Sequence, residues 1–232
     1  MGGGSINAKI ATACRGCGRD PASVRLVAVS KTRPAADISA ALQAGQTIFG
    51  ENRVQEAREK IPQVNASHTS QAQWHLIGPL QRNKVKIAVR LFQMIHSIDS
   101  LALAQEIHHA CLWPIPVLIQ VNLGRESQKI GFLPEHLPEA LRTMQPLSNI
   151  QIQGLMAIPP FLPEPEQTRH YFRKLAQLAQ HMNDLNLEGI SMAELSMGMS
   201  HDFEIAIEEG ATFVRIGSAL FGSREILPPE RH

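Results

Sequence analysis

A lysine stands directly after a short apolar run, at a position that is unusual for a surface charge. Residues 26 to 32 read LVAVSKT, in which branched apolar residues end abruptly in Ser30, Lys31 and Thr32. The amine of a lysine forms a Schiff base with an aldehyde when an apolar setting keeps it unprotonated. Lys31 is therefore the first candidate for covalent chemistry, although a lysine at a strand end is more often ion-paired or partly exposed.

Two stretches near the end of the chain, rich in glycine and hydroxyl groups, have the composition of an anion site. SMGMS spans Ser196 to Ser200, and RIGS spans Arg215 to Ser218. Backbone N–H groups at glycines can approach a phosphate closely. Either stretch alone can equally be a plain turn or a strand end with an ion-paired arginine. Together with Lys31 they indicate a ligand that is both an aldehyde and a phosphate ester, and pyridoxal 5′-phosphate (PLP) is the leading such ligand.

The elements that must position these residues alternate between strand-like and helix-like patterns. Several of the apolar runs are continuous rather than alternating, which is typical of parallel strands covered on both faces. The expected strands are Arg25–Ser30, Thr47–Gly50, Trp74–Ile77, Met94–Ser97, Pro116–Asn122, Ile150–Met156, Met192–Met197 and Thr212–Gly217.

Helical patterns lie between the expected strands. Pro34 opens one helix and Gly45 closes it, and Asn52 precedes RVQEAREKI, for which Pro62 is the expected stop. Glu164–Leu187 carries apolar residues on one face. A further helix, roughly Ile6–Cys14, precedes the first strand.

This alternation predicts a single α/β domain over residues 6–232, a (β/α)₈ barrel of the TIM type with an extra N-terminal helix, after a flexible lead at 1–5. An open doubly wound sheet is the alternative, but no G-x-G-x-x-G follows the first strand. In a barrel, the carboxyl ends of the strands form the working face. Polar and glycine residues gather at these ends, namely Lys31, GEN at 50–52, IGPLQRNK at 77–84, Ser97, Asp99, Asn122, SMGMS and RIGS.

Composition narrows the class of protein. The 232 residues are 44% hydrophobic and carry a net charge of +1, which argues against broad nucleic-acid or membrane binding. We expect a cytoplasmic protein, because no signal peptide or membrane-spanning run is visible and three cysteines do not suit a disulfide scaffold. We also expect a monomer.

The histidines and cysteines of the sequence do not indicate a metal site. Cys14 and Cys17 form a C-x-x-C without a second pair, and the adjacent His108 and His109 point to different faces of a helix, so no metal site is predicted. His75 is either a ligand contact or a hydrogen-bonded core residue, and His201 lies near the expected site.

The chain resembles the pyridoxal-phosphate homeostasis proteins, whose barrel is similar to the N-terminal domain of alanine racemase. The resemblance covers residues 6 to 224 and is carried by VAVSKT, FGENRVQE, WHLIGPLQRNK, IHSIDS, GLMAIP, LSMGMSHDFE and VRIGSALFG. It implies that Lys31 forms the Schiff base with PLP and that Arg215 faces the pyridine nitrogen. It further implies that Ser200, Gly217 and Ser218 hold the phosphate, and that Asn52 lines the pocket. Ser218 departs from the threonine more common in the family but keeps the hydroxyl.

Three functions remain open from the residues. The first, which we expect, is a PLP homeostasis protein that holds PLP and releases it or hands it to apo PLP-dependent enzymes, without being an enzyme itself. The second is a PLP-dependent amino-acid racemase, which needs a second acid/base group, whereas the only tyrosine, Tyr171, falls in a long helix. The third is an aldolase-type lyase whose lysine binds a sugar phosphate directly. An arginine at the ring nitrogen also weakens the cofactor as an electron sink, which favours the first function.

Overall fold

Short runs of branched and aromatic residues, buried from both sides, form a closed barrel of parallel strands. In the computed structural model, which describes residues 3–67, 72–126, 128 and 130–221, each strand pairs with the next and the last pairs with the first, in the order β1 to β8. The strands are β1 Arg25–Val29, β2 Ile48–Glu51, β3 Gln73–Leu76, β4 Met94–Ile98, β5 Ile115–Gln120, β6 Ile150–Met156, β7 Glu194–Met199 and β8 Phe213–Ile216. The predicted (β/α)₈ barrel is confirmed.

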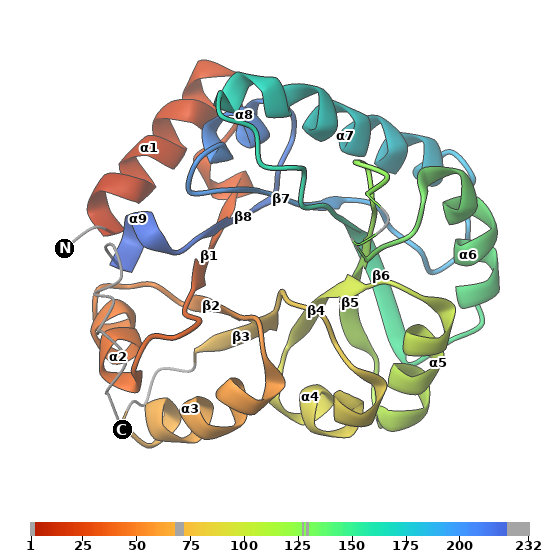
Figure 1. Cartoon of the computed structure of the whole chain (residues 1–232), viewed down its shortest axis with the longest axis horizontal. Coiled ribbons are helices and arrows are strands. Elements are labelled where there is room, and N and C mark those ends of the chain that lie inside the picture. The colour runs from red at the N-terminus through yellow and green to blue at the C-terminus, as the bar shows by residue number, and fades with distance from the viewer. Residues whose placement is uncertain (1–2, 68–71, 127, 129, 222–232) are drawn as a thin grey trace.

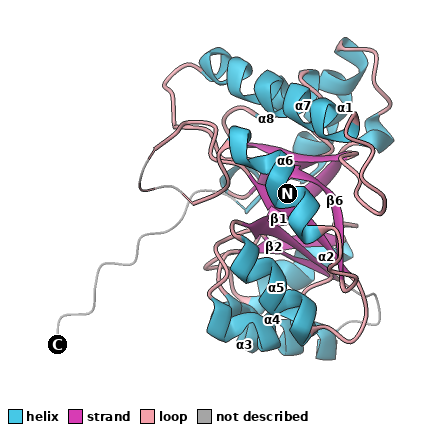
Figure 2. Ribbon diagram, turned by 90° about the vertical axis from the view of Figure 1, so that its right-hand side faces the viewer, coloured by secondary structure: helices cyan, strands magenta, loops and turns pink. Residues whose placement is uncertain are grey.

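Helices surround this barrel, as the view down its axis shows (Figure 1). They are α1 Gly3–Gly16, α2 Ala35–Gln43, α3 Val54–Ser67, α4 Val85–Leu91, α5 Leu101–Ala110, α6 Leu137–Met144, α7 Arg169–Asn183, α8 Phe203–Glu208 and α9 Ser218–Phe221. Helices α2 to α8 each connect one strand to the next. Helix α1 precedes β1 and packs beside α8, where it closes the ring between the last and first crossovers (Figures 1 and 2).

Two apolar layers hold the barrel together. The larger one lies between the strands and the helices and includes Ile38, Phe49 and Phe172. The smaller one fills the interior of the barrel with Val27, Ile48, Ile77, Met94, Leu118, Met156 and Phe213. Parallel strands buried on both faces produce the continuous apolar runs seen in the sequence.

Three boundaries differ from the sequence-based expectations. Helix α1 begins at Gly3, so Gly3–Ser5 of the expected flexible lead are helical, and the remainder of that lead lies outside the described residues. Pro62 does not stop its helix, because α3 continues through it to Ser67 and buries Ile61 and Val64 against the core. A proline inside a helix removes one backbone hydrogen bond, and burial of these neighbours offsets that cost.

The expected long helix at Glu164–Leu187 is also divided. A 3₁₀ turn at Pro165–Thr168 leads into α7, which ends at Asn183. Among the described residues, no helix combines the length and apolar character that crossing a bilayer requires.

Candidate functional site

Arg215 lies inside the barrel near the carboxyl ends of the strands and is 4% exposed. It is the third residue of β8, and its Nη1 donates to Ser196 Oγ at 2.6 Å while Nη2 donates to the Ala157 carbonyl at 3.0 Å. Burial lowers the pKa of Arg215 to about 10, so the guanidinium stays charged at neutral pH. A buried cation with a fixed orientation is the central electrostatic feature of this end of the barrel.

Lys31 follows β1 at the same end and is half-buried in the turn that leads to α2. The residue before it is fixed in the sheet. The Ser30 N–H donates to the Gly50 carbonyl at 3.0 Å, and Ser30 Oγ donates to Glu51 Oε1 at 2.7 Å. The residue after it, Thr32, has a φ of +62°, an uncommon conformation for a β-branched residue.

A buried ion pair behind Lys31 holds this turn in place. Lys60 Nζ on α3 donates to the Ser30 carbonyl at 2.8 Å and contacts Glu51 Oε1 and Glu56 Oε1, each at 2.7 Å. Glu56 also accepts a hydrogen bond from the Thr32 N–H. Burial raises the pKa of Glu51, and the hydrogen bonds from Lys60 and Ser30 oppose that rise. The strained turn at Thr32 is thus tied to α3 on both sides of Lys31.

Asn52 follows β2 and presents an unused acceptor. Its Oδ1 is buried and has no hydrogen-bond partner among the described residues. The loop after β3 approaches it closely, since a Cβ built on Gly78 would lie 2.3 Å from the Asn52 carbonyl oxygen. A buried acceptor without a partner is costly unless a ligand or water satisfies it.

The loops after β7 and β8 lie against each other. The Gly217 N–H points to Ser200 Oγ at 3.4 Å. Gly198 has a φ of +89°, and a Cβ there would lie 2.5 Å from Ala206 Cβ, so the SMGMS turn requires glycine at this position. Asp202 closes the turn by accepting the Met199 N–H at 2.8 Å. Ser200 is half-buried, and Ser218 is exposed at the start of α9.

The barrel topology brings the six predicted site residues to one side of the mouth. They follow or belong to four neighbouring strands, in the order β7, β8, β1 and β2. Val27 of β1 pairs in register with Arg215 of β8. The set is Lys31, Asn52, Ser200, Arg215, Gly217 and Ser218.

Other polar residues at the mouth, on β4 and after β5, already have partners within the chain. Ser97 Oγ donates to the Gly78 carbonyl at 2.6 Å, and Asn122 Nδ2 donates to the Glu126 carbonyl at 2.9 Å. They help to fix the loops, and the candidate site is centred on the opposite side, around Arg215.

A line of buried polar side chains continues from Arg215 into the barrel, and the sequence analysis singled out neither His96 nor the connection that it makes. His96 Nδ1 lies 2.9 Å from Ser196 Oγ, and His96 Nε2 lies 3.0 Å from His75 Nδ1. His75 is therefore a hydrogen-bonded core histidine, one of the two alternatives expected. Polar residues inside otherwise apolar strands, MIHSI and ELSMGM, were the available signal.

The remaining histidines and cysteines form no metal site within the described part of the chain. His201 is exposed, and its Nε2 lies 3.2 Å from the Leu162 carbonyl. Cys14 is buried and Cys17 exposed, and both are free thiols.

Comparison with known proteins identifies the relatives of this barrel. The family described as "Alanine racemase, N-terminal domain" matches residues 5–225. The pyridoxal phosphate homeostasis protein of Pseudomonas aeruginosa is 44% identical over 227 residues, which cover 97% of this chain and 95% of the relative. That of Escherichia coli K12 is 41% identical over 223 residues, 95% of this chain and 94% of the relative. The chain belongs to the pyridoxal phosphate homeostasis protein family.

Solved structures of this family have the same architecture. PipY of Synechococcus elongatus without PLP is 38% identical, with a TM-score of 0.83, and covers 94% of this chain and 100% of its own. The structure of PipY with PLP bound has a TM-score of 0.81 and covers 92% of this chain and 100% of its own. Alanine racemase of Clostridium difficile is 15% identical with a TM-score of 0.66, and this chain covers 56% of it, a likeness of fold alone.

Proposed function

We propose that this protein binds PLP at the carboxyl end of its barrel and acts in PLP homeostasis, holding the cofactor and releasing it. The observation that carries the proposal is that Lys31 follows β1 at the same end of the barrel as the buried Arg215 on β8, the strand that pairs with β1. The PLP-bound structure of PipY, a 38% identical member of the same family, supports it.

The residues of the site suit the chemical groups of PLP. Lys31 supplies an amine for covalent attachment at the aldehyde carbon. Ser200, Gly217 and Ser218 supply hydroxyl and backbone N–H groups for the phosphate. Asn52 lines the pocket with a buried Oδ1 that still lacks a partner among the described residues. Each role is an assignment that mutation can test.

Arg215 is assigned to the pyridine nitrogen of the cofactor. PLP, when bound, supplies an electron-withdrawing ring, which is strongest when the ring nitrogen is protonated. The pKa of Arg215, about 10, keeps the guanidinium in its donor form at neutral pH. A donor opposite the ring nitrogen disfavours protonation there. The site then favours storage of the cofactor over carbanion chemistry.

A racemase needs a second acid/base group, and two candidates among the described residues, Tyr171 and His201, are not placed for that role. Tyr171 lies on α7, outside the barrel, where its ring packs against His170. His201, which follows Ser200 in the sequence, is another candidate for the acid/base group, but it is exposed and contacts the Leu162 carbonyl. We therefore propose a carrier rather than an enzyme, with apo PLP-dependent enzymes as recipients. We further propose that it acts as a cytoplasmic monomer.

The proposal is tested by the absorption spectrum and by transfer. Purified protein incubated with PLP and freed of excess ligand should absorb in the near-visible region, and Lys31→Ala should not. The loaded protein, mixed with an apo PLP-dependent enzyme, should restore that enzyme's activity, while a mock-loaded sample should not. The proposal is wrong if the wild-type protein incubated with PLP shows no near-visible absorption and restores no activity to the apo enzyme.

A further inference from the structure

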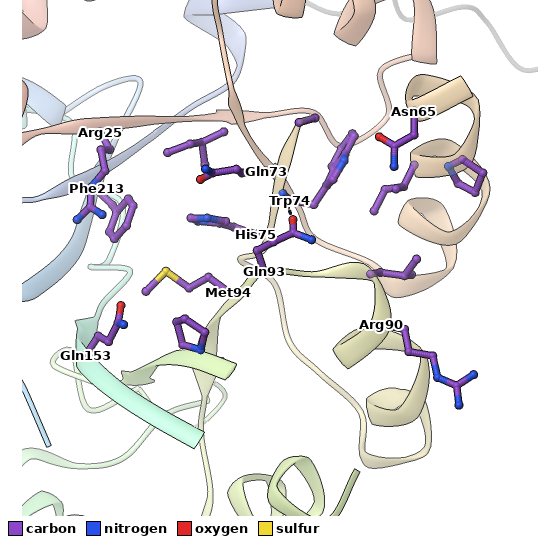
Figure 3. A pocket seen from close by; sticks show the side chains of 16 residues that line it. Arg25, Asn65, Gln73, Trp74, His75, Arg90, Gln93, Met94, Gln153 and Phe213 are labelled. Atoms are coloured by element: carbon purple, nitrogen blue, oxygen red, sulfur yellow. Dashed lines mark hydrogen bonds between the residues drawn. The ribbon is translucent and has the colours of Figure 1, made fainter. Parts of the chain in front are cut away.

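A cavity opens at the end of the barrel opposite the candidate site, at the amino-terminal ends of the strands. It has a volume of about 860 Å³ and is bounded at the barrel mouth by Arg25, Gln73, His75, Met94, Gln153 and Phe213. Figure 3 shows these side chains gathered at the mouth, with Trp74, Asn65 and Arg90 farther along the cavity. Pockets for small organic ligands commonly have about 300–1,000 Å³. The volume is therefore that of a ligand site.

The walls of this cavity suit an organic anion with an apolar body. Two arginines, Arg25 and Arg90, line it, and no acidic residue is among the described residues that do. Arg25 pairs with Glu194, which lies outside the lining, and its guanidinium stacks 3.8 Å from the centroid of the Phe213 ring. A guanidinium has five N–H donors, so one ion pair leaves further donors for a ligand.

The indole of Trp74 adds an unused donor. Trp74 is 1% exposed, and its Nε1 is buried without a hydrogen-bond partner among the described residues. A buried N–H without an acceptor is unfavourable. The cavity itself offers the donors of two arginines, and the rest of its lining is apolar apart from side-chain amides and His75.

His75 connects this cavity to the cofactor side of the barrel. It lines the cavity. Three contacts lead from it along the barrel interior to Arg215: His75 Nδ1 to His96 Nε2 at 3.0 Å, His96 Nδ1 to Ser196 Oγ at 2.9 Å, and Arg215 Nη1 to Ser196 Oγ at 2.6 Å. Burial lowers the pKa of His75 to about 4 and holds that of His96 well below its usual value, so both rings are neutral at neutral pH.

Because both rings are neutral, the hydrogen bonds that join Ser196, His96 and His75 can run in either of two directions. In one, Ser196 donates to His96, His96 donates to His75, and His75 Nε2 carries a proton that it can donate into the cavity. In the other, both hydrogen bonds are reversed, and Nε2 of His75 is an acceptor. Ser196 Oγ accepts from Arg215 in both directions. Only in the first does the hydroxyl also donate along the chain, and a hydroxyl that donates is a stronger acceptor. The first direction therefore holds Arg215 better.

We propose that the amino-terminal cavity is a second binding site, for a small carboxylate with an apolar or aromatic body, and that it is coupled to Arg215 through His75, His96 and Ser196. The carboxylate lies against Arg25 and accepts the His75 Nε2 proton, which selects the first direction of the chain. Because that direction stabilises Arg215, the ligand tightens PLP binding. This coupling rests on the proposed function, whereas binding in the cavity does not.

The first part of the test measures binding in the absence of PLP. Trp113→Phe leaves Trp74 as the only tryptophan, and Trp113 is 71% exposed, so the change should not disturb the fold. Phenylacetate should change Trp74 fluorescence saturably, and calorimetry should give the same affinity. Neutral phenylacetamide should bind at least about tenfold more weakly, since a charge-assisted hydrogen bond is worth roughly 1.5–3 kcal/mol.

Variants then locate the site. Arg25→Gln in the same background should weaken phenylacetate binding by about tenfold or more, and Arg25→Lys should recover part of it. Arg58→Gln, which removes an exposed arginine of α3 outside the cavity lining, serves as the matched control and should bind as well as the parent. Ser200→Ala should also leave this binding intact. Absence of saturable binding, or equal binding by Arg25→Gln with a native circular dichroism spectrum, overturns the site.

The second part measures the coupling. Saturating phenylacetate should tighten PLP binding at least about fivefold, and PLP should tighten phenylacetate binding by the same factor. In Ser196→Ala, phenylacetate should still bind, but the factor should fall to one. Phenylacetate binding that leaves PLP affinity unchanged or weaker overturns the coupling. Failure of PLP to bind at all counts against the proposed function. It does not count against the cavity, because the fluorescence titration without PLP measures binding there independently.

Discussion

Lys31 owes its position to its neighbours. Ser30 is bonded to Glu51, Thr32 is bonded to Glu56, and Lys60 joins both carboxylates to the strand end. The amine itself needs no ion pair to hold it in this arrangement. A lysine placed in this way is available for a reacting carbonyl, because its turn is fixed by groups that do not compete for it.

Substitution of this lysine is the most direct test at the residue scale. Borohydride reduction of the PLP-loaded protein should label the peptide that contains Lys31, as shown by mass spectrometry. Lys31→Ala should lose the near-visible absorption and keep weak binding through the phosphate. Lys84→Ala, at a lysine after β3, is the control and should keep the label. A label on the peptide containing Lys84 would contradict the assignment.

The phosphate contacts make a second prediction. Ser200→Ala and Ser218→Ala should each weaken PLP binding by about 1.5–3 kcal/mol, because each removes a hydrogen bond to a dianion. Affinities can be measured by equilibrium dialysis. Pyridoxal, which has no phosphate, should bind much more weakly to the wild type and should barely distinguish it from Ser200→Ala. Equal affinities for PLP and pyridoxal would show that the phosphate lies elsewhere.

Among the elements, the loop after β3 limits the room beside Asn52. Gly78→Ala would place its Cβ 2.3 Å from the Asn52 carbonyl oxygen and 2.7 Å from Asn52 Cα, so the backbone of one loop must move. We expect PLP affinity to fall by tenfold or more, which corresponds to a loss of about 1.4 kcal/mol of binding free energy. The melting temperature should also fall. Gly16→Ala is the control, since nothing lies within 4 Å of a Cβ there. Unchanged affinity in Gly78→Ala would separate this loop from the site.

The histidines of β3 and β4 predict a loss of stability in acid. Unfolded histidine binds a proton near pH 6.5, whereas burial lowers the pKa of folded His75 to about 4. The stability from its neutral ring is present above pH 6.5 and is lost as the pH falls toward 4, amounting to about 2 kcal/mol between pH 7 and 5. Urea unfolding at both pH values measures this difference.

A variant isolates that contribution. The raised pKa values of Glu51 and Asp202 act in the opposite sense, since a carboxyl protonated more readily in the folded state favours folding at lower pH. His75→Gln keeps a hydrogen-bonding side chain that does not titrate, so its stability should fall less between pH 7 and 5 than that of the wild type. Equal losses in the two proteins would rule out a neutral, buried His75.

The elements also show how far the sequence could predict the structure. Apolar runs such as those of β1 and β6 are local, so the strand positions were expected within a few residues. Pro62 was misjudged because its helix is stabilised by burial of Ile61 and Val64, which only tertiary packing reveals. The chain from His75 to Arg215 joins four strands at long separations, and no local spacing could have predicted it.

At the scale of the whole molecule, the proposed carrier role predicts that the PLP-loaded protein does not turn over amino acids at a useful rate. With Lys31 alone on one side of the substrate, racemisation should remain at a trace, because a general acid or base typically contributes 10²–10⁴-fold. Incubation of the PLP-loaded protein with several L-amino acids, followed by chiral analysis, ammonia and keto-acid assays, measures this. Lys31→Ala is the control. Robust racemisation that disappears in this variant would favour the racemase alternative over the carrier.

Because β1 pairs with β8, the complete site can form only after almost the whole barrel has been synthesised. Lys31 leaves the ribosome early, whereas Arg215, Gly217 and Ser218 are among the last residues of the barrel to be made. A nascent chain that lacks β8 has an open sheet and half of the proposed site: it has Lys31, Asn52 and Ser200 but not Arg215, Gly217 and Ser218. Joining β8 to β1 forms the contacts of longest sequence separation in the barrel, and such contacts form slowly. The cofactor can therefore be captured fully only by a finished barrel, and free PLP should favour that last closure.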